Sequence, residues 1–168
     1  MKIYRILTVL SSLFVLPLFL NFYVIGQNTK KKIKDDVCSA SNPASICSAG
    51  NACGSASSPC SIDIRRSAGS SATATPNIPG AKANKAFCIK TGTTVTFTSS
   101  SKDTGFVLDF GNSNPFDHPG AIMGGVDRPI TVTARHPGCY TYSVGACTAG
   151  TVYGMCGDDV AQFVISEK

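Results

Sequence analysis

Histidine is scarce in this chain, and so are the motifs that usually carry catalysis. His118 and His136 are the two histidines among 168 residues, so none precedes Asp117. The sequence contains no G-x-S-x-G motif, no glycine-rich phosphate loop in a strand-to-helix setting, and no cysteine expected to stay a free thiolate. These absences remove nucleophilic catalysis and phosphate-loop chemistry. We therefore predict that the protein is not an enzyme.

A basic surface is also missing from the part of the chain that is expected to fold. The formal charge is +5, but between residues 38 and 168 nine Lys and Arg stand against eight Asp and Glu. The excess lies nearer the N-terminus, in the cluster Lys30, Lys31, Lys32 and Lys34. Nucleic-acid binding needs a basic face interleaved with aromatic residues, and none is visible. We expect no nucleic-acid partner.

Cysteine is abundant, yet no two cysteines have the Cys-x-x-Cys spacing that is typical of zinc sites. An even set of eight in a small chain favours a disulfide framework, which an oxidising compartment permits and a modest core needs. We therefore predict four disulfides among the eight cysteines, which are Cys38, Cys47, Cys53, Cys60, Cys88, Cys139, Cys147 and Cys156.

The N-terminal segment has the features of an export sequence. Lys2 and Arg5 precede a largely apolar run over residues 6–25, and Gly26 offers a cleavage site before Gln27. Residues 1–26 are thus a signal peptide or a retained N-terminal anchor, with residues 6–25 as the membrane tether in the second case. We expect the protein to be secreted, or to be extracytoplasmic and membrane-anchored, with an extracellular or envelope partner that the sequence does not identify.

Two regions follow the export segment. Residues 27–59 combine the basic tether with a Ser/Ala/Cys-rich extension that is too poor in large apolar residues to build its own core. The first four cysteines permit two local bridges in three pairings, or one of them could reach into the following domain. Residues 60–168 form the folded domain.

Short alternating segments separated by turn residues predict an all-β domain over residues 60–168. For example, Val95 and Phe97 share one parity, and Phe106, Leu108 and Phe110 share another. A Ser, Thr and Pro stretch through Pro79 reads as an edge segment, and residues 111–127 read as a long irregular loop. The expected strands are residues 61–66, 86–90, 93–98, 105–110, 129–134, 139–144 and 160–165.

The end of the chain resembles the cupredoxin superfamily, the plastocyanin-like blue copper proteins. Gly138, Tyr140 and Tyr142 form a G-x-Y-x-Y pattern that is followed by a variable loop and a final V-x-x-x-V strand. The resemblance implies an antiparallel Greek-key β-sandwich over residues 60–168. It also implies that the copper cysteine would stand at Val144 and the first copper histidine near Phe106, so the copper-ligand motif is lacking.

We therefore expect no cofactor, with copper as the alternative. A non-standard copper site for electron transfer would have to use His118, His136, Cys147, Met155 and Cys156, since Cu(I) favours sulfur ligands. Against this, a Cys147–Cys156 disulfide would close the last hairpin. Cys88 and Cys139 are then left to pair with each other, by elimination.

These observations predict a disulfide-stabilised binding or structural module, and a wall or matrix component without a discrete ligand fits equally well. Loops carry function more often than sheet faces do. We expect the contact region at the end that bears residues 116–126 and the loop between Cys147 and Cys156, where apolar side chains would be exposed. The expected contact residues are Phe116, Ile122, Met123, Val152, Tyr153 and Met155.

Overall fold

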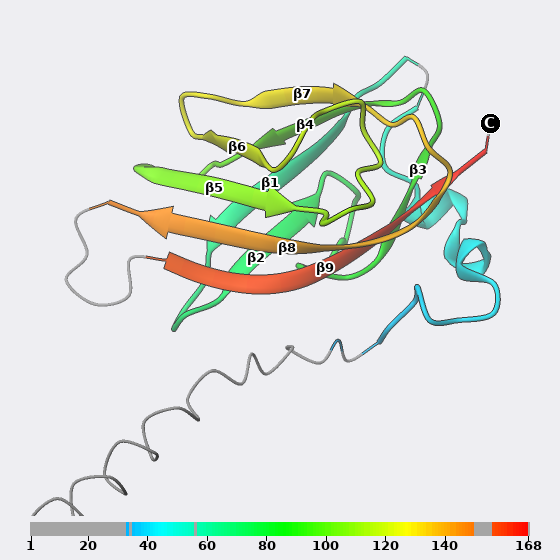
Figure 1. The fold of residues 1–168 in the computed structure, drawn as a ribbon, viewed down its shortest axis with the longest axis horizontal. Helices are drawn as coiled ribbons and strands as arrows, with labels where there is room; N and C mark the ends of the chain where they lie inside the picture. The colour runs from blue at the N-terminus through cyan, green and yellow to red at the C-terminus, as the bar shows by residue number, and fades with distance from the viewer. Residues whose placement is uncertain (1–32, 34, 56, 150–155, 168) are drawn as a thin grey trace, which may run out of the picture. The chain divides into compact units, whose positions relative to one another are not determined.

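Two β-sheets make up the computed structural model, which describes residues 33, 35–55, 57–149 and 156–167 (Figure 1). The four-stranded sheet has the order β2-β1-β4-β7, and the five-stranded sheet has the order β3-β9-β8-β5-β6. Two short 3-10 helices, η1 (Pro43–Ile46) and η2 (Ala49–Asn51), precede them. The strands are β1 (Cys60–Arg66), β2 (Ala72–Pro76), β3 (Phe87–Lys90), β4 (Thr94–Thr98), β5 (Thr104–Asp109), β6 (Ile122–Gly125), β7 (Ile130–Thr133), β8 (Gly138–Thr148) and β9 (Cys156–Ser166).

The all-β prediction is confirmed, but the expectation of a purely antiparallel sheet is wrong. β1 pairs with β4 in parallel, and β3 pairs with β9 in parallel. The reason lies in the path of the chain: after the β1–β2 hairpin, β3 joins the other sheet, and the chain returns to the first sheet as β4 in the direction of β1. The sheets are therefore mixed.

One expected loop contains a strand. β6 (Ile122–Gly125) lies within the stretch that was expected to be irregular, and it pairs with β5 through Leu108 opposite Ile122 and Gly105 opposite Gly125. Glycine is depleted in strands, so strand propensity does not predict β6, which contains two glycines in four residues. As the last strand in the sheet order, β6 forms one edge of the five-stranded sheet.

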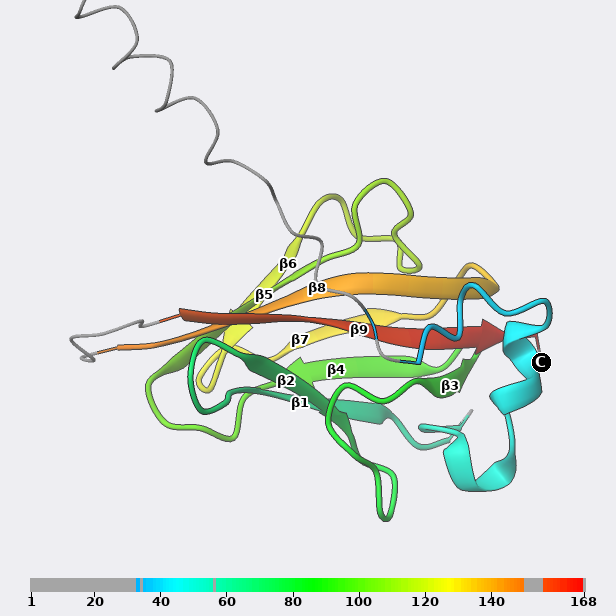
Figure 2. The ribbon, with the colours of Figure 1, turned by 90° about the horizontal axis from the view of Figure 1, so that it is seen from below.

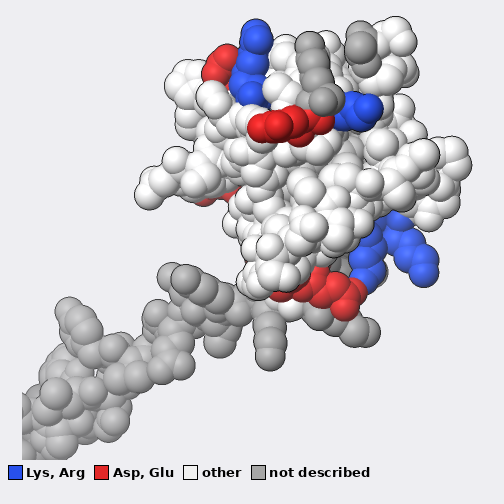
Figure 3. Space-filling model, turned by 90° about the vertical axis from the view of Figure 1, so that its right-hand side faces the viewer, with Lys and Arg blue, Asp and Glu red and all other residues white. Residues whose placement is uncertain are grey.

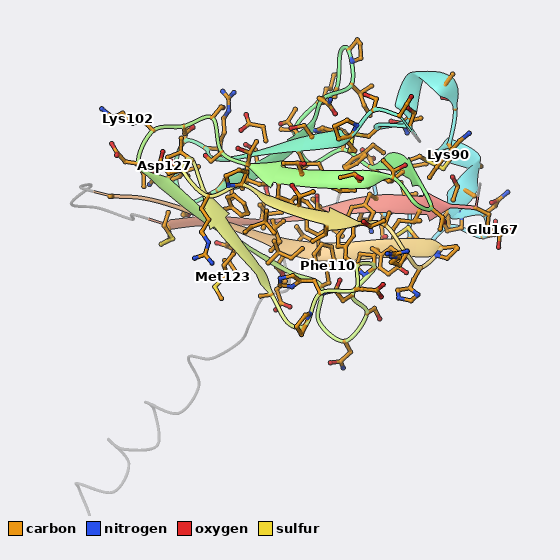
Figure 4. All side chains as sticks on the ribbon, turned by 90° about the horizontal axis from the view of Figure 1, so that it is seen from above. Lys90, Lys102, Phe110, Met123, Asp127 and Glu167 are labelled. Atoms are coloured by element: carbon orange, nitrogen blue, oxygen red, sulfur yellow. A yellow bond between two sulfur atoms is a disulfide. The ribbon has the colours of Figure 1, made fainter. Side chains whose placement is uncertain are left out.

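Aromatic side chains fill the space between the two sheets. Phe116 packs edge-on against Phe97 of β4, with ring centroids 5.7 Å apart. It packs in the same way against Phe110, which directly follows β5 in the other sheet, with ring centroids 5.5 Å apart. Phe116 is 2% exposed and Ile122 is fully buried. The prediction that these two residues form a contact surface is therefore wrong, because both lie in the core. Figure 4 labels Phe110, which is also buried.

Tyr142 carries a hydroxyl with no hydrogen-bond partner in this core. Its ring stacks on Phe110 with centroids 5.0 Å apart, and burial raises its pKa far above the ordinary value. We expect Tyr142→Phe to raise the free energy of unfolding by about 1 kcal/mol, because the variant no longer desolvates an unpaired hydroxyl. Urea unfolding of the two proteins measures this change, and a loss of 1 kcal/mol or more would show that the hydroxyl is satisfied, for example by a buried water.

Four disulfides join the eight cysteines, as predicted. Cys147–Cys156 closes the β8–β9 hairpin as expected, and Cys53–Cys60 is local. Two cysteines of the extension, however, reach the five-stranded sheet, in the bridges Cys38–Cys139 and Cys47–Cys88. Residues 33–59 accordingly belong to the same compact unit as the strands.

The elimination that paired Cys88 with Cys139 is wrong for a geometric reason. Both cysteines stand opposite Val164, one on each side of β9. Two strand spacings amount to about 9.5 Å, whereas bridged Cα atoms lie within about 7 Å. Cys88 and Cys139 therefore cannot bond to each other without displacing β9.

The expected export segment and most of the lysine cluster lie outside the described residues. Within the described part of the chain, no helix is long and apolar enough to cross a membrane.

Candidate binding surface

The extension covers one half of the outer face of the five-stranded sheet. Gln162 of β9 accepts a hydrogen bond from the Val37 backbone N–H (2.9 Å) and donates to Asp36 Oδ1 (2.6 Å) and to Thr141 Oγ1 (2.9 Å). Cys38 is bonded to Cys139 in the same region. Figure 2 shows the blue extension beside the C-terminal half of β9.

Asp36 is held as a carboxylate at this contact. Hydrogen bonds from Ser39 and Gln162 lower the pKa of Asp36 below its ordinary value, because both donors favour the charged form. The amide of Gln162 is 2% exposed, and the three bonds named above use both of its polar atoms. The extension is thus fixed on the sheet by a bridge and by a satisfied polar contact.

The other half of the outer face, over β8, β5 and β6, is left uncovered by the described part of the extension and carries few side chains. In the register of the sheet, Gly145 of β8 stands opposite Val107 of β5, and Val107 stands opposite Met123 of β6. One row further along, Gly105 stands between Cys147 and Gly125. Because side chains alternate across a strand, all of these positions point away from the core.

Two exposed apolar side chains are neighbours on this open half, and a third lies in the turn that follows β6. Among the described residues, the large hydrophobic side chains that count as exposed are Val107 (38%), Met123 (64%) and Val126 (37%). Figure 4 shows Met123 projecting outward from β6. Val126 lies next to the same strand pair, since its N–H donates to the Thr104 carbonyl. We call this surface the β5–β6 platform and define it by Gly105, Val107, Met123, Gly125, Val126 and Gly145.

A shallow depression of about 390 Å³ lies at the end of the platform. It is lined by Asp103 of the β4–β5 turn, by Thr104 and Gly105 of β5, and by the chain from Met123 to Arg128. A Cβ atom on Gly124 would lie 2.6 Å from the Arg128 carbonyl oxygen and 2.6 Å from Phe106 Cζ. Glycine at this position therefore lets the β6–β7 turn pack closely.

Carboxylates surround the platform. Asp109 follows Val107 on the outer face of β5, and Asp158 of β9 stands opposite Gly145. Asp103 and Asp127 lie in the two turns that line the depression. All four residues are exposed, and the neighbouring turns add two cations, Lys102 and Arg128. Figure 4 shows Lys102 and Asp127 at the same end of the molecule.

The expected alternative copper ligands are not brought together. Cys147 and Cys156 are bonded to each other, and Met155 lies outside the described residues. His136 precedes the first residue of β8, whereas Cys147 is near its other end, and an 11-residue strand spans about 35 Å. Among the residues that the structure describes, no three His, Cys, Asp or Glu side chains form a group that could hold a metal.

The two histidines lie instead at the end of the sandwich opposite the β8–β9 hairpin. The Pro115 carbonyl accepts hydrogen bonds from the Arg135 and His136 backbones, which places residues 115–118 beside residues 135–136. His136 Nε2 lies 3.3 Å from Asp117 Oδ1, and Arg135 Nε lies 3.1 Å from Asp117 Oδ2. All three side chains are exposed. Val144, where the resemblance implied a copper cysteine, is fully buried in the core.

The expected contact region does not lie at a single end of the molecule. Residues 116–118 lie at the end away from the hairpin, because β6 runs back along β5 before Val126 reaches Thr104. Of the predicted contact residues, Met123 is exposed, Phe116 and Ile122 are buried, and Val152, Tyr153 and Met155 lie outside the described residues.

Sequence reasoning missed Val107, which lies on a sheet face and not in a loop. The alternation that places Phe106 and Leu108 in the core places Val107 outward, and an apolar residue at an outward position is the signal that could have found it. Comparison with known proteins adds no further constraint: no protein-family model matches the chain, and no curated protein is significantly similar to it.

Proposed function

We propose that this protein is an exported, disulfide-stabilised binding module that uses the β5–β6 platform as its contact surface. The observation that carries the proposal is that the exposed apolar side chains Val107 and Met123 are opposite each other on the open part of the sheet, with the exposed Val126 in the turn that follows β6. A contiguous exposed apolar patch is the kind of surface that marks an interaction site, whereas single scattered apolar side chains are ordinary. Four disulfides suit an oxidising, extracytoplasmic compartment.

We further propose that the scaffold is a Greek-key sandwich of the cupredoxin type that works without copper. Three features support this: β8 carries the G-x-Y-x-Y pattern, β9 follows it as its partner, and the Tyr140 hydroxyl donates to the His136 carbonyl four residues upstream. Such a tyrosine corner is known from Greek-key sandwiches. The copper positions are filled by apolar side chains, and the sulfur of Cys147 is bridged.

The proposal includes neither catalysis nor nucleic-acid binding. The sequence lacks the motifs that usually carry catalysis. For the second, the end of the molecule that bears the C-terminus is mostly uncharged, and its few cations lie beside carboxylates (Figure 3). A continuous basic patch, which nucleic-acid binding needs, is not visible on that face.

A photo-crosslinking residue in place of Met123 tests the proposed contact surface. In cells that export the full chain, we expect irradiation to give defined adducts from position 123 and none from position 131. Thr131 is the matched control, because it is exposed on the outer face of the other sheet. Equal adducts from both positions, or none from position 123, would contradict the proposal.

A further inference from the structure

We infer that the β5–β6 platform binds extended peptide segments that combine aliphatic side chains with lysine or arginine. The inference rests on the proposed function and names the chemistry of its partner.

The apolar part of the ligand follows from the side chains at the centre of the platform. Val107 and Met123 are directly opposite each other on neighbouring strands, so they form one continuous apolar contact. The Cys147–Cys156 bridge adds sulfur next to Gly105 in the adjoining row. An aliphatic side chain placed here would remove apolar surface from water on both partners.

The extended shape of the ligand follows from the glycines. Gly105 and Gly125 have no side chains above the sheet, so a second chain can approach the backbone there, whereas the space over Gly145 is taken by Val107. Gly145 also makes room for its neighbour, since a Cβ atom at this position would lie 2.8 Å from Val107 Cγ1. β6 is the last strand in the sheet order, but Gly125 already pairs with Arg128 along its edge. The peptide therefore lies across the sheet face, where an extended chain presents alternate side chains to the platform.

The positive charge expected of the ligand follows from the charged side chains around the platform, which we call its rim. Four exposed carboxylates, Asp103, Asp109, Asp127 and Asp158, surround the platform, against the two cations Lys102 and Arg128. The side-chain charges on the open half of the sheet face itself, Asp109 and Asp158, are both negative. Complementary charge at a rim raises the association rate and selects the partner. The same carboxylates disfavour an anionic lipid surface.

Fluorescence anisotropy with three labelled nine-residue peptides tests the inference on the purified full chain. The first peptide alternates Lys and Val, the second Glu and Val, and the third Lys and Ser. We expect the Lys–Val peptide to bind at least about tenfold more tightly than the other two, because it alone supplies both kinds of contact. Its affinity should fall between about 0.1 M and about 1 M salt, over which the Debye length shrinks from about 10 Å to about 3 Å.

Two variants locate the site. Met123→Ser removes the most exposed apolar side chain, and we expect it to weaken Lys–Val binding by about tenfold. Asp109→Asn removes a rim charge but keeps the oxygen that accepts the Gly111 N–H, so it should weaken binding a few-fold and flatten the salt dependence. Thr131→Ala on the other sheet should leave binding unchanged.

Each contrary result overturns a different part of the inference. Equal binding of the Glu–Val peptide would refute the role of charge, and equal binding of the Lys–Ser peptide would refute the apolar contact. Unchanged binding by Met123→Ser would place the site elsewhere. If crosslinks form at position 123 but the Lys–Val peptide does not bind, the ligand class is wrong while the proposed function stands.

Discussion

Replacing Cys38 and Cys139 together by serine is expected to lower the free energy of unfolding by about 4 to 5 kcal/mol. The bridge joins residues that are 101 positions apart, so its loss frees a long closed loop in the unfolded chain. In the chain-entropy account the cost grows with the logarithm of loop length, so the inner Cys47–Cys88 bridge, which removes 41 positions from the loop, lowers the cost by less than about 1 kcal/mol. Denaturant unfolding under oxidising conditions measures the change.

The matched control is the double variant Cys147→Ser and Cys156→Ser. This bridge closes a loop with a separation of 9, so its loss should cost about 2 to 3 kcal/mol by the same reasoning. The Cys38 and Cys139 variant should also lose part of the protection of the Val37 amide from hydrogen exchange. The extension next to residue 38 would then be held only by its contacts with Gln162 and Lys85, while Cys47 stays bridged to Cys88. Equal losses of stability in the two variants would show that loop length does not set the contribution of these bridges.

The disulfide pattern shows which structural features can be predicted from the sequence and which cannot. Spacing alone predicted that every cysteine is bridged and that Cys147 pairs with Cys156, because these two flank one turn. The partner of Cys139 depended on information that spacing does not hold, namely that β9 separates Cys139 from Cys88. A strand order is a long-range property, and here it decided the connectivity.

The strands show the same division between local and long-range information. Alternation located β4 and β5 to within a residue, since an inward row such as Val95 and Phe97 is a local signal. β6 carries two glycines in four residues and pairs only because β5 lies beside it. The sequence likewise predicts a surface loop for Phe116, and its burial follows from its ring contacts with Phe97 and Phe110.

The candidate surface was half predictable. Met123 was expected to be exposed, but its partner Val107 and the glycines on either side meet only through the register of β8, β5 and β6. The sequence places apolar residues on the outward parity of single strands. It does not show that these positions are adjacent, and adjacency is what turns scattered exposed side chains into a surface.

Gly157→Ala is expected to destabilise the protein by about 3 kcal/mol or more. A Cβ atom on Gly157 of β9 would overlap the Ser71 carbonyl group, in the turn that joins β1 to β2. That turn cannot simply move away, because the Ser67 N–H donates to the Ser71 carbonyl (2.8 Å) and the Asp158 N–H donates to the Ser70 carbonyl (3.0 Å). Displacing the turn would weaken both hydrogen bonds, at about 1 kcal/mol each, in addition to the cost of overpacking.

Gly50→Ala is the control for this substitution, because a Cβ atom there would meet nothing within 4 Å. Thermal and denaturant unfolding should leave Gly50→Ala within about 0.5 kcal/mol of the parent protein, as expected for a change at an open surface position. A Gly157→Ala protein as stable as this control would mean that the β1–β2 turn does not rest on β9. In that case the contact between the two sheets at the hairpin end would have to be held by side chains alone, and Gly157 would have no steric reason to be glycine.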